Sequence, residues 1–514
     1  MPAADDTPHR LRGITLGLVT AAAALGSAEL VAGLARGFAS PITQVGDRVI
    51  DHVPVWLKTF AIRTFGTNDK KVLIGTVFAV LLVFAAIIGL LSRKHRRLAL
   101  VGIALFGVIG AAASIAGVGG FTAAVPSIVG GIVGVVTLHV LAGRIWGRST
   151  EAVGVPSAGP NRRAFLRVTG SVAALGIVAA AGGRQLRTRF NAAVDRAKVI
   201  LPTARKPLAK LDIAKVQVDA PGITPFITPN ASFYRIDTAL DVPQVAIADW
   251  KLDVSGMVDT PLSFTYDDLL NRDLVEVDMT LTCVSNELGG ILAGTARWLG
   301  VPLTELLDEA GVSKRADQVV GRSIDGYTCG FPVSTATDGR TALVAVGMNG
   351  EPLPVEHGFP ARLIVAGLYG YVSATKWLTE IKLTRFDQFD QYWVPRGYAD
   401  RAPIKTFSRI DTPKPLTSIP AGTHAIAGVA WAQTRGISKV EVSIDNGPWQ
   451  QSTLADAPNK ETWRQWMFPA QLASGRHTIT CRATDGTGAT QTEQRVEPLP
   501  DGATGWHSVV VLVA

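Results

Sequence analysis

Long apolar runs dominate the first third of the chain. Four nearly uncharged runs lie near 13–35, 72–92, 98–118 and 126–146, and a shorter Ala- and Gly-rich run lies near 168–183. Each of the four is long enough to cross a hydrocarbon core of about 30 Å. A buried core helix would explain any single run, but it does not explain four in succession. The pattern therefore predicts an N-terminal transmembrane bundle of five helical spans.

The distribution of Lys and Arg predicts the orientation of this bundle. Basic residues precede the first run, join the second run to the third, and follow the fourth. Such loops are typically cytoplasmic. With five spans, everything after about residue 184 then lies outside the membrane. Arg184, Arg187 and Arg189 oppose this orientation, because they follow the fifth run on the side where few cations are expected.

A basic motif immediately before the fifth run indicates a route of export. Residues 161–167 (NRRAFLR) resemble the twin-arginine targeting motif, in which two arginines, a spacer, Phe and Leu precede a mildly hydrophobic segment. That route moves folded proteins. A basic juxtamembrane patch is the alternative interpretation. The run that follows is either a retained anchor or a cleaved signal, and the sequence leaves both open.

Three further features belong to the first 150 residues. Glu29 lies inside the first run, where an ionisable group is costly, so it is either a functional residue or a neutral acid hydrogen-bonded between helices. His139 is the histidine placed within a span, and a membrane haem would need facing histidines, so we predict none. Residues 40–70 mix apolar and charged positions and predict a helix that lies at the outer interface.

Beyond the spans, the pattern divides the chain further. We predict a four-span domain (1–150), the twin-arginine motif with the fifth span (151–183), and a Pro-, Lys- and Ala-rich stalk (184–230). Short β-type runs mixed with helix-like segments such as TYDDLL and LTELLDEAG predict an α+β domain over 231–405. Residues 415–514 contain β-type runs separated by turns such as DNGP and DGTG, which predicts a β-sandwich.

Composition agrees with this division and narrows the function. The 514 residues exceed one domain, and a hydrophobic content of 47% places part of the chain in lipid. The net charge of +8 owes much to arginines that flank the spans, and it gives no case for nucleic acid binding. Cys283, Cys329 and Cys481 fit neither a disulfide framework nor a CxxC metal signature.

Cys283, in the stretch MTLTCVSN (279–286), is the main candidate for chemistry. A thiolate suits a soft transition metal that changes its redox state. Most isolated cysteines, however, are buried small hydrophobic residues. The sequence around it favours the metal. The blocks PNASFYRIDTAL (229–240), TLTCVSNELGG (280–290), SIDGYTCGFPVSTATD (323–338), MNGEPLPVEHGFPARLIVAGLYGYVSATKWLTEI (348–381) and YWVPRGY (392–398) resemble the sulfite oxidase family of molybdopterin-dependent oxidoreductases, here in a bacterial membrane-anchored form.

The C-terminal part resembles that family's immunoglobulin-like dimerisation domain, on the segments VEVSIDNGPW (440–449), WRQW (463–466) and CRATDGTGATQ (481–491). The resemblance implies a molybdopterin cofactor loaded in the cytoplasm, which suits export in the folded state. It also implies that Cys283 is the metal's protein ligand, that Tyr327 is the active-site tyrosine, and that Arg235 faces the substrate anion. Without it, Tyr327 is a strand aromatic and Arg235 pairs with Asp237 at the surface.

Several other residues match the family's cofactor contacts. His357, Arg362 and Lys376 occupy positions that contact the pterin phosphate and ring, and Asn230, Tyr234 and Ser323 match cofactor contacts more loosely. A buried phosphate needs fixed cations and backbone donors in place of water. Arg362 could otherwise be a surface arginine, but its neighbours FPARLIVAG are apolar. Lys376 could otherwise be a lysine at the edge of a strand.

The chain departs from sulfite-oxidising relatives after Asn286, where the family has two arginines that help to bind the dianion. Here Glu287 and Leu288 follow, which removes attraction for a doubly charged anion and adds repulsion. The resemblance thus implies a membrane-anchored oxidoreductase for two-electron oxygen-atom transfer on a small oxyanion or oxide outside the inner membrane, with sulfite disfavoured. Electrons would pass to or from a separate external carrier such as a cytochrome, and a homodimer is possible. The alternative is a non-catalytic membrane-tethered binding or assembly subunit of a respiratory complex.

Overall fold

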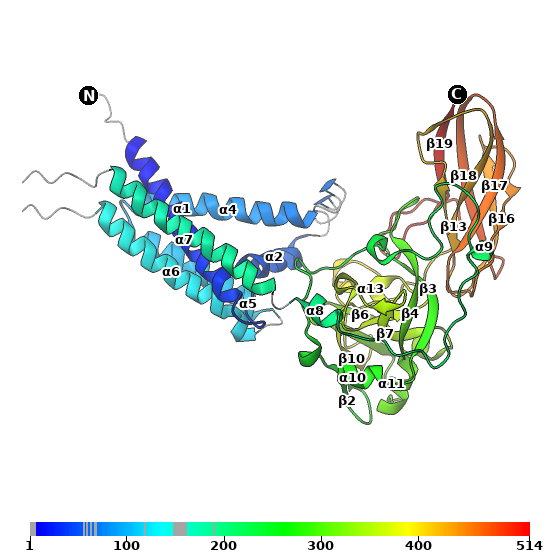
Figure 1. The fold of residues 1–514 in the computed structure, drawn as a ribbon, viewed down its shortest axis with the longest axis horizontal. Coiled ribbons are helices and arrows are strands. Elements are labelled where there is room, and N and C mark those ends of the chain that lie inside the picture. The colour runs from blue at the N-terminus through cyan, green and yellow to red at the C-terminus, as the bar shows by residue number, and fades with distance from the viewer. Residues whose placement is uncertain are drawn as a thin grey trace, which may run out of the picture. The chain divides into compact units, whose positions relative to one another are not determined.

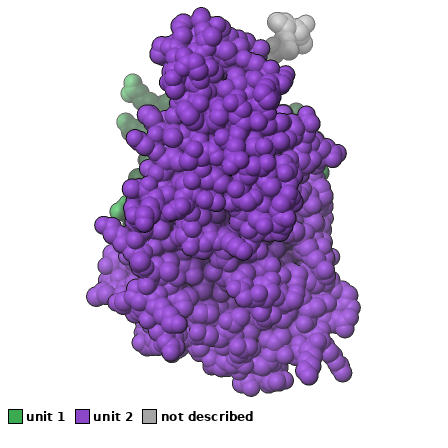
Figure 2. Space-filling view, turned by 90° about the vertical axis from the view of Figure 1, so that its right-hand side faces the viewer, with its two compact units in different colours: residues 1–191, 239–242 green, residues 192–238, 243–514 purple. Residues whose placement is uncertain are grey.

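The computed structural model describes residues 7–54, 57, 60–61, 64–65, 69–117, 120–146, 162–188 and 191–514. The chain forms two compact units, which Figure 2 distinguishes by colour. Unit 1 comprises Met1–Asn191 and Ala239–Val242, and unit 2 comprises Ala192–Thr238 and Pro243–Ala514. Residues 151–161, which include the first residue of the twin-arginine motif, lie outside the described residues.

Unit 1 is helical (Figure 1). Its main elements are α1 (Thr7–Ala32), α2 (Pro41–His52), α4 (Asp69–Leu91), α5 (Arg96–Ile115), α6 (Gly120–Trp146) and α7 (Arg162–Arg187). In the described part of the chain, five helices are long and apolar enough to cross a membrane, and α2 is not among them. Each predicted apolar run is therefore a helix. Helix α2 falls within the segment for which the sequence predicted an interfacial helix.

Small residues bring the helices of unit 1 into backbone contact. A Cβ added at Gly107 of α5 would lie 2.9 Å from Gly131 Cα of α6, and one added at Gly26 of α1 would lie 2.7 Å from Gly176 Cα of α7. Helices associate in this way where apolar burial gives no driving force between them. Other faces of these helices carry exposed apolar side chains, including those of Phe78, Val83, Val101, Val108, Phe121, Leu175 and Ile177.

Unit 2 begins with residues that the sequence predicted to be part of a stalk. They include the short helices α8 (Ala192–Arg196) and α9 (Ile213–Val216). Arg196 donates its Nε to Leu353 O (2.9 Å), and the backbone N–H of Val218 donates to Gln465 Oε1 (2.9 Å). This segment therefore lies along the surface of unit 2 and is fixed to it by hydrogen bonds.

Two sheets form the first part of unit 2. One has the strand order β2-β1-β10-β5-β6, in which β1 and β10 are parallel. The other is antiparallel, with the order β3-β4-β7-β8 and with β9 paired to β7. Strand β7 has the sequence ALVAVGM and is buried at every residue, as expected for an uninterrupted apolar run. The bounds are β1 (Leu252–Gly256), β2 (Leu262–Phe264), β3 (Val275–Thr282), β4 (Ala293–Pro302), β5 (Gln318–Ser323), β6 (Thr328–Pro332), β7 (Ala342–Met348), β8 (Glu351–Pro352), β9 (Arg362–Val365) and β10 (Leu378–Thr384).

Short helices join these strands, at positions the sequence predicted for two of them. Thr265 caps α10 (Tyr266–Leu270) through a capping box with Asp268, and Gly311 ends α11 (Leu303–Ala310) in a left-handed conformation with φ 68°. The others are α12 (Val333–Thr337) and α13 (Gly370–Ser373). The predicted mixture of strands and helices is thus present in this part of the chain.

The last part of unit 2 consists of two sheets that share one apolar core. Their strand orders are β11-β13-β17-β16 and β12-β19-β18-β14-β15. The core includes Ile426, Val440, Trp466 and Ile479. The bounds are β11 (Phe407–Thr412), β12 (Ser418–Ile419), β13 (Gly422–Trp431), β14 (Ile437–Ile444), β15 (Gln450–Gln451), β16 (Thr453–Leu454), β17 (Arg464–Leu472), β18 (Gly475–Asp485) and β19 (His507–Val513).

This C-terminal part covers the free edge of β3. The backbone N–H of Thr280 donates to Glu461 O (3.0 Å), and its Oγ1 accepts from the backbone N–H of Trp463 (2.7 Å). The Trp463 indole donates to Phe226 O (2.9 Å), and the Gln433 amide donates to Thr280 O (2.9 Å). An uncovered edge strand would present unpaired backbone groups. Here the edge joins the two parts of unit 2.

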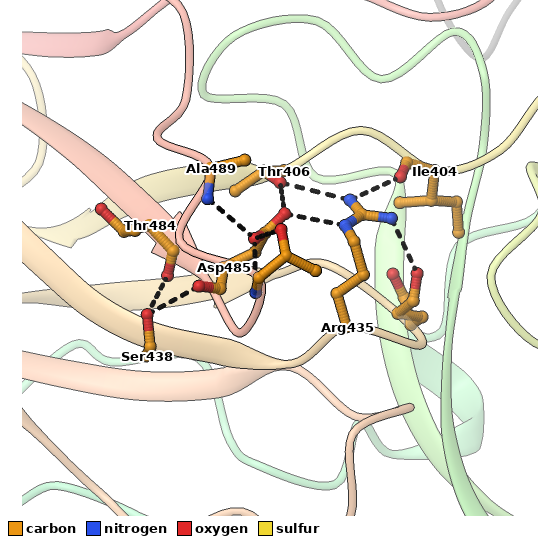
Figure 3. A network of polar contacts seen from close by, with 9 residues as sticks. Ile404, Thr406, Arg435, Ser438, Thr484, Asp485 and Ala489 are labelled. Atoms are coloured by element: carbon orange, nitrogen blue, oxygen red, sulfur yellow. Dashed lines mark hydrogen bonds and ion pairs between the residues drawn. The ribbon is translucent and has the colours of Figure 1, made fainter.

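A polar network holds residues 404–406, which lie in the segment that connects the two parts of unit 2 (Figure 3). Asp485 accepts from Arg435 Nε (2.7 Å) and from Thr406 Oγ1 (2.9 Å), and Arg435 also donates to Ile404 O (3.1 Å). Burial alone would raise the pKa of Asp485, but hydrogen bonds from Thr487, Arg435 and Thr406 hold it below its ordinary value. The carboxylate therefore stays ionised, and its hydrogen bonds hold residues 404–406 against the end of β18.

Candidate active site

Cys283 is the first residue after β3 and starts a loop that leads to β4. Its backbone N–H donates to Leu292 O (2.9 Å), and Asn286 Oδ1 accepts from the Leu292 N–H (2.8 Å), so the loop closes on itself. Burial raises the pKa of the Cys283 thiol, although hydrogen bonds from Ser285 oppose the shift. Such a thiol is protonated at neutral pH, and coordination to a metal is what would remove the proton.

The C-terminal sheets hold the other end of this loop. Arg409 of β11 donates its Nη1 to Gly290 O (2.8 Å). His507 of β19 lies so close to Gly289, where φ is 75°, that a Cβ at that position would overlap the imidazole ring. His507 Nδ1 accepts from the Ile410 N–H (3.0 Å), and burial lowers the pKa of this histidine to about 4. The neutral ring and the glycine therefore pack against each other.

Four tyrosines interact electrostatically with Cys283. The pKa values of Tyr234, Tyr327, Tyr369 and Tyr398 are all raised, first by burial and further by interactions that include one with Cys283. Each hydroxyl therefore keeps its proton at neutral pH and can donate a hydrogen bond.

The Tyr327 hydroxyl already has a partner. It donates to Tyr371 O (2.8 Å), and the Tyr371 hydroxyl donates to Ala399 O (2.8 Å). The aromatic contacts continue through the segment 392–398, with ring centroids 5.6 Å apart for Tyr327 and Tyr392, 5.3 Å for Tyr371 and Tyr398, and 5.1 Å for Trp393 and Tyr398. This aromatic wall gives the site low polarity.

Arg362 starts β9 and is only 6% exposed. Its Nη1 donates to His357 O (3.1 Å), and its guanidinium lies 5.2 Å from the centroid of the Trp298 ring. Within residues 191–514, which are described without a gap, its Nε has no hydrogen-bond partner and no carboxylate pairs with it. Burial lowers the Arg362 pKa to about 10, so it is charged at neutral pH. A buried, unpaired cation is costly unless an anion binds it.

His357 lies beside Arg362 and is also buried. Its Nε2 donates to Asn230 O (3.1 Å). Burial, followed by the charge of Arg362, lowers the His357 pKa to about 4. The imidazole is therefore neutral at pH 7, and its proton is on Nε2.

Lys376 and Arg235 share one carboxylate. Lys376 Nζ donates to Asp237 Oδ2 (2.7 Å), and Arg235 Nε donates to the same oxygen (2.9 Å). The Asp237 side chain is 4% exposed, whereas that of Arg235 is 39% exposed. Burial lowers the Lys376 pKa to about 8, although Asp237 opposes this shift. Arg235 thus forms the ion pair with Asp237 that was its alternative role, and it does so beside Lys376.

Asn230 and Ser323 have structural partners. Asn230 Nδ2 donates to Glu351 Oε1 (2.6 Å), and its Oδ1 accepts from Asn349 Nδ2 (2.7 Å). Its contact with the neutral imidazole of His357 is made by its backbone carbonyl, which accepts from His357 Nε2 (3.1 Å). The Ser323 backbone N–H donates to Tyr327 O (2.9 Å), which closes the turn that presents the tyrosine. Both residues therefore support the site through the backbone.

Comparison with known proteins identifies this part of the chain. Residues 239–393 match the oxidoreductase molybdopterin binding domain family. Over 342 residues the chain is 29% identical to the mitochondrial sulfite oxidases of Macaca fascicularis and Homo sapiens, which covers 56% of this chain and 62% of each relative. Residues 239–393 thus form a molybdopterin-binding oxidoreductase domain, and over a little more than half of its length the chain is similar to sulfite oxidases.

Proteins with other names are similar to this chain as well. It is 29% identical over 337 residues to the NADH nitrate reductase of Solanum lycopersicum, which covers 53% of this chain and 37% of that protein. The sulfane dehydrogenase SoxCD of Paracoccus pantotrophus shares the fold, with a TM-score of 0.50 and 21% identity over 62% of this chain and 92% of that one. The chain spans 62% of the length of the sulfite oxidases it matches, less than two thirds.

The site fits the molybdopterin that this family binds. A pterin phosphate needs a fixed cation, and Arg362 is buried with an unpartnered Nε. A polar ring needs donors, and buried Asn286 Nδ2 and Thr282 Oγ1, on either side of Cys283, have no partner within residues 191–514. The structure thus offers a soft sulfur, a separate cation and unsatisfied donors, which are the groups that this cofactor requires.

Several residues of the site were not singled out from the sequence. Tyr369 and Tyr398 interact electrostatically with Cys283, and Arg409 and His507 hold its loop. A signal for the tyrosines was present, because the blocks 348–381 and 392–398 contain four of the chain's seven tyrosines. No comparable signal marked Arg409 and His507, which reach the loop from the C-terminal sheets.

Proposed function

We propose that this chain is a membrane-anchored molybdopterin-dependent oxidoreductase that catalyses two-electron oxygen-atom transfer on a small substrate outside the cytoplasmic membrane. The observation that carries the proposal is the pairing of one buried thiol, Cys283, with a separate buried cation, Arg362, that lacks an anionic partner in residues 191–514. A molybdenum pterin needs a soft ligand at its metal and a cation at its phosphate.

Each side chain has a defined task in this proposal. Cys283 is the metal's protein sulfur ligand, and Arg362, His357 and Lys376 hold the phosphate and ring of the pterin. When bound, the group supplies a two-electron redox centre. Tyr327 keeps its proton because its pKa is raised well above the ordinary value, so its hydroxyl can leave Tyr371 O and donate to the substrate.

The loop after Cys283 affects which substrate charge the site favours. Glu287 is exposed, and Leu288 is half-buried with its Cδ1 3.0 Å from the position of a Cβ added at Gly505. The positions that carry two arginines in sulfite-oxidising relatives therefore present an acid to solvent and an aliphatic side chain to the C-terminal sheets. We propose a neutral or singly charged substrate, such as a sulfoxide or an N-oxide, in preference to sulfite.

The placement of the parts belongs to the same proposal. The five apolar helices would span the inner membrane, and the twin-arginine motif would direct unit 2 outward in the folded state. The C-terminal sheets would form an immunoglobulin-like domain and pair two copies of the chain. Electrons would pass one at a time to or from an external carrier such as a cytochrome.

Metal and cofactor analysis of the full-length protein tests this function. The chain is purified from membranes of a host that makes molybdopterin, and we expect about one Mo and one pterin per chain. Protease applied to intact spheroplasts should digest unit 2 and spare the cytoplasmic loops. A chain without Mo or pterin, purified from a host whose own molybdenum enzymes are loaded, would favour the non-catalytic assembly subunit and contradict the proposal.

A further inference from the structure

Helix α7 packs along α1 through glycines on both helices. A Cβ added at Gly26 would lie 2.7 Å from Gly176 Cα, and one added at Gly33 would lie 2.9 Å from Gly183 Cα. From the other side, a Cβ at Gly176 would lie 2.5 Å from Ala22 O. The two helices therefore meet backbone to backbone at two levels, seven residues apart in each sequence. This is the small-residue packing found between permanent membrane helices.

A polar contact adds to this packing near the ends of both helices. Glu29 of α1 is buried, and its Oε2 lies 3.7 Å from Arg187 Nη2 of α7. The hydroxyl of Ser40, at the start of α2, donates to Glu29 Oε1. The two oxygens of one carboxylate are thus used separately, one by α7 and one by α2. Without α7, this carboxylate would lose its cationic partner.

The ion pair accounts for one of the three arginines that oppose the predicted orientation. Arginines that follow a span on the outer side oppose the positive-inside tendency. Arg187 is one of them, but its charge is matched by Glu29 across the helix interface. The acid in the first span and the cation after the fifth are both unfavourable alone, and they compensate each other only when the two helices are together.

We infer that α7 is retained in the mature protein as a fifth span that docks on a preformed face, made by Ala22, Gly26 and Glu29 of α1 and by Gly33 directly after it. A signal that is cleaved and released needs no such match with another helix of the same chain. Because the twin-arginine motif precedes α7, the first four spans would present this face to a helix that arrives by a separate machinery. The inference rests on the membrane placement proposed above and is independent of the oxidoreductase activity.

Cleavage is tested on the intact chain. The protein carries a C-terminal tag, is recovered from carbonate-washed membranes, and is analysed on a denaturing gel with peptide mapping of the band. We expect a single polypeptide that contains peptides of both α1 and unit 2. A tagged fragment that begins near residue 184 would overturn the inference. A chain released by carbonate would overturn the membrane placement, and with it the docking, independently of cleavage and of metal content.

Docking is tested by crosslinking. A Cβ at Gly182 would lie 3.8 Å from Leu30 Cδ1, so the side chains at these two positions face each other, and the pair Leu30→Cys and Gly182→Cys should be bridged by a short bifunctional thiol crosslinker. A protease site inserted between Trp146 and Arg162 then separates α1 from α7 unless the bridge has formed. The native cysteines, Cys283, Cys329 and Cys481, are buried and lie in unit 2, so they do not interfere.

Glycine variants provide matched controls in this assay. Gly176→Leu should lower the crosslinking yield about tenfold, because its side chain would meet the α1 backbone. Gly170→Leu on the same helix should leave the yield unchanged, because a Cβ there meets nothing within 4 Å. Equal yields for the two variants, or no bridge in the unmodified background, would show that α7 does not dock on α1.

The role of the ion pair between Glu29 and Arg187 is tested by exchanging the two charges. Glu29→Arg should reduce the crosslinking yield, and adding Arg187→Glu to it should restore most of the yield, since the pair is re-formed with its signs exchanged. If the second change gave no recovery, the ion pair would have no part in docking. Recovery in the double variant also shows that loss in the single variant is not a general failure to insert.

Discussion

Two regions of unit 2 each bury an arginine, and they differ in what the arginine binds. Arg409, at the junction with the C-terminal sheets, is 4% exposed and donates its Nε to Asp411 Oδ1 (2.6 Å). Its other nitrogens reach Gly290 O and Thr224 Oγ1. Arg362 is 6% exposed, but in residues 191–514 it has no carboxylate partner and keeps an unpartnered Nε.

The comparison distinguishes Arg409, whose charge is neutralised within the fold, from Arg362, whose charge is available to bind an anion. A buried ion pair with all its hydrogen bonds made contributes to the fold, and breaking it is expensive. A buried cation without an anion makes the fold less stable and becomes favourable when an anion arrives. Equal burial therefore says little about function, whereas the identity of the partners distinguishes the two arginines.

The largest effect is expected when each arginine is replaced by Met in the cofactor-free protein. Arg409→Met should lower the free energy of unfolding of unit 2 by about 3–5 kcal/mol, because Asp411 is left buried without its partner. Arg362→Met should leave this free energy unchanged or raise it. Urea unfolding followed by Trp fluorescence measures both. Equal losses in the two variants would mean that Arg362 is also a structural cation.

A smaller effect is expected on cofactor retention. Arg362→Met should weaken pterin binding roughly 10- to 100-fold, the effect of one lost charge-assisted contact of about 1.5–3 kcal/mol. Arg322→Met serves as a control, because Arg322 forms a half-exposed ion pair with Glu380. Pterin content after gel filtration measures the loss. The same pterin content in both variants would contradict the role of Arg362.

The sequence predicted residues that stand out from their neighbours in the chain better than it predicted contacts between distant segments. Arg362 stood out because its neighbours are apolar, and Cys283 because it ends a β-type run. The helices of unit 1 followed from continuous apolar runs. In contrast, Arg409 reaches the loop after Cys283 only because β11 packs against it, more than 100 residues along the chain. No local pattern encodes a contact of that kind.

Local sequence also failed to predict how the two cations around Asp237 are arranged. The sequence assigned Arg235 to the substrate and Lys376 to the pterin, with the Asp237 ion pair as an alternative for Arg235 alone. The structure joins all three at one carboxylate oxygen. Lys376 lies 139 residues from Asp237, so this sharing arises from the tertiary fold and not from the motif.

The charge of Lys376 should make pterin binding depend on pH. Its pKa is lowered to about 8, so its charge is present below that pH and is lost above it. Pterin binding should therefore weaken between pH 7 and pH 9 by up to about tenfold, the effect of one charged contact. Lys376→Arg should flatten the profile, because the guanidinium stays charged. A profile unchanged by this substitution would assign the pH dependence to another group.

The smallest effect concerns substrate selection. Leu288→Arg restores one cation next to the site and should raise the ratio of sulfite to sulfoxide activity about fivefold, which corresponds to about 1 kcal/mol. Glu287→Gln is the companion variant and should raise the ratio less, because Glu287 is exposed. Steady-state kinetics with both substrates measure the ratio. Efficient sulfite oxidation by the unmodified protein would contradict the substrate proposal.

The central claim is that Cys283 is the ligand of a bound molybdenum, and one paired measurement tests it directly. Turnover, Mo content and pterin content are determined for Cys283→Ser and for Cys329→Ser, which changes a second buried cysteine of the same unit. We expect Cys283→Ser to abolish turnover while the pterin is retained through Arg362, His357 and Lys376, because a hydroxyl cannot replace the soft thiolate. Cys329→Ser should stay active. Near-native turnover in Cys283→Ser would contradict the account.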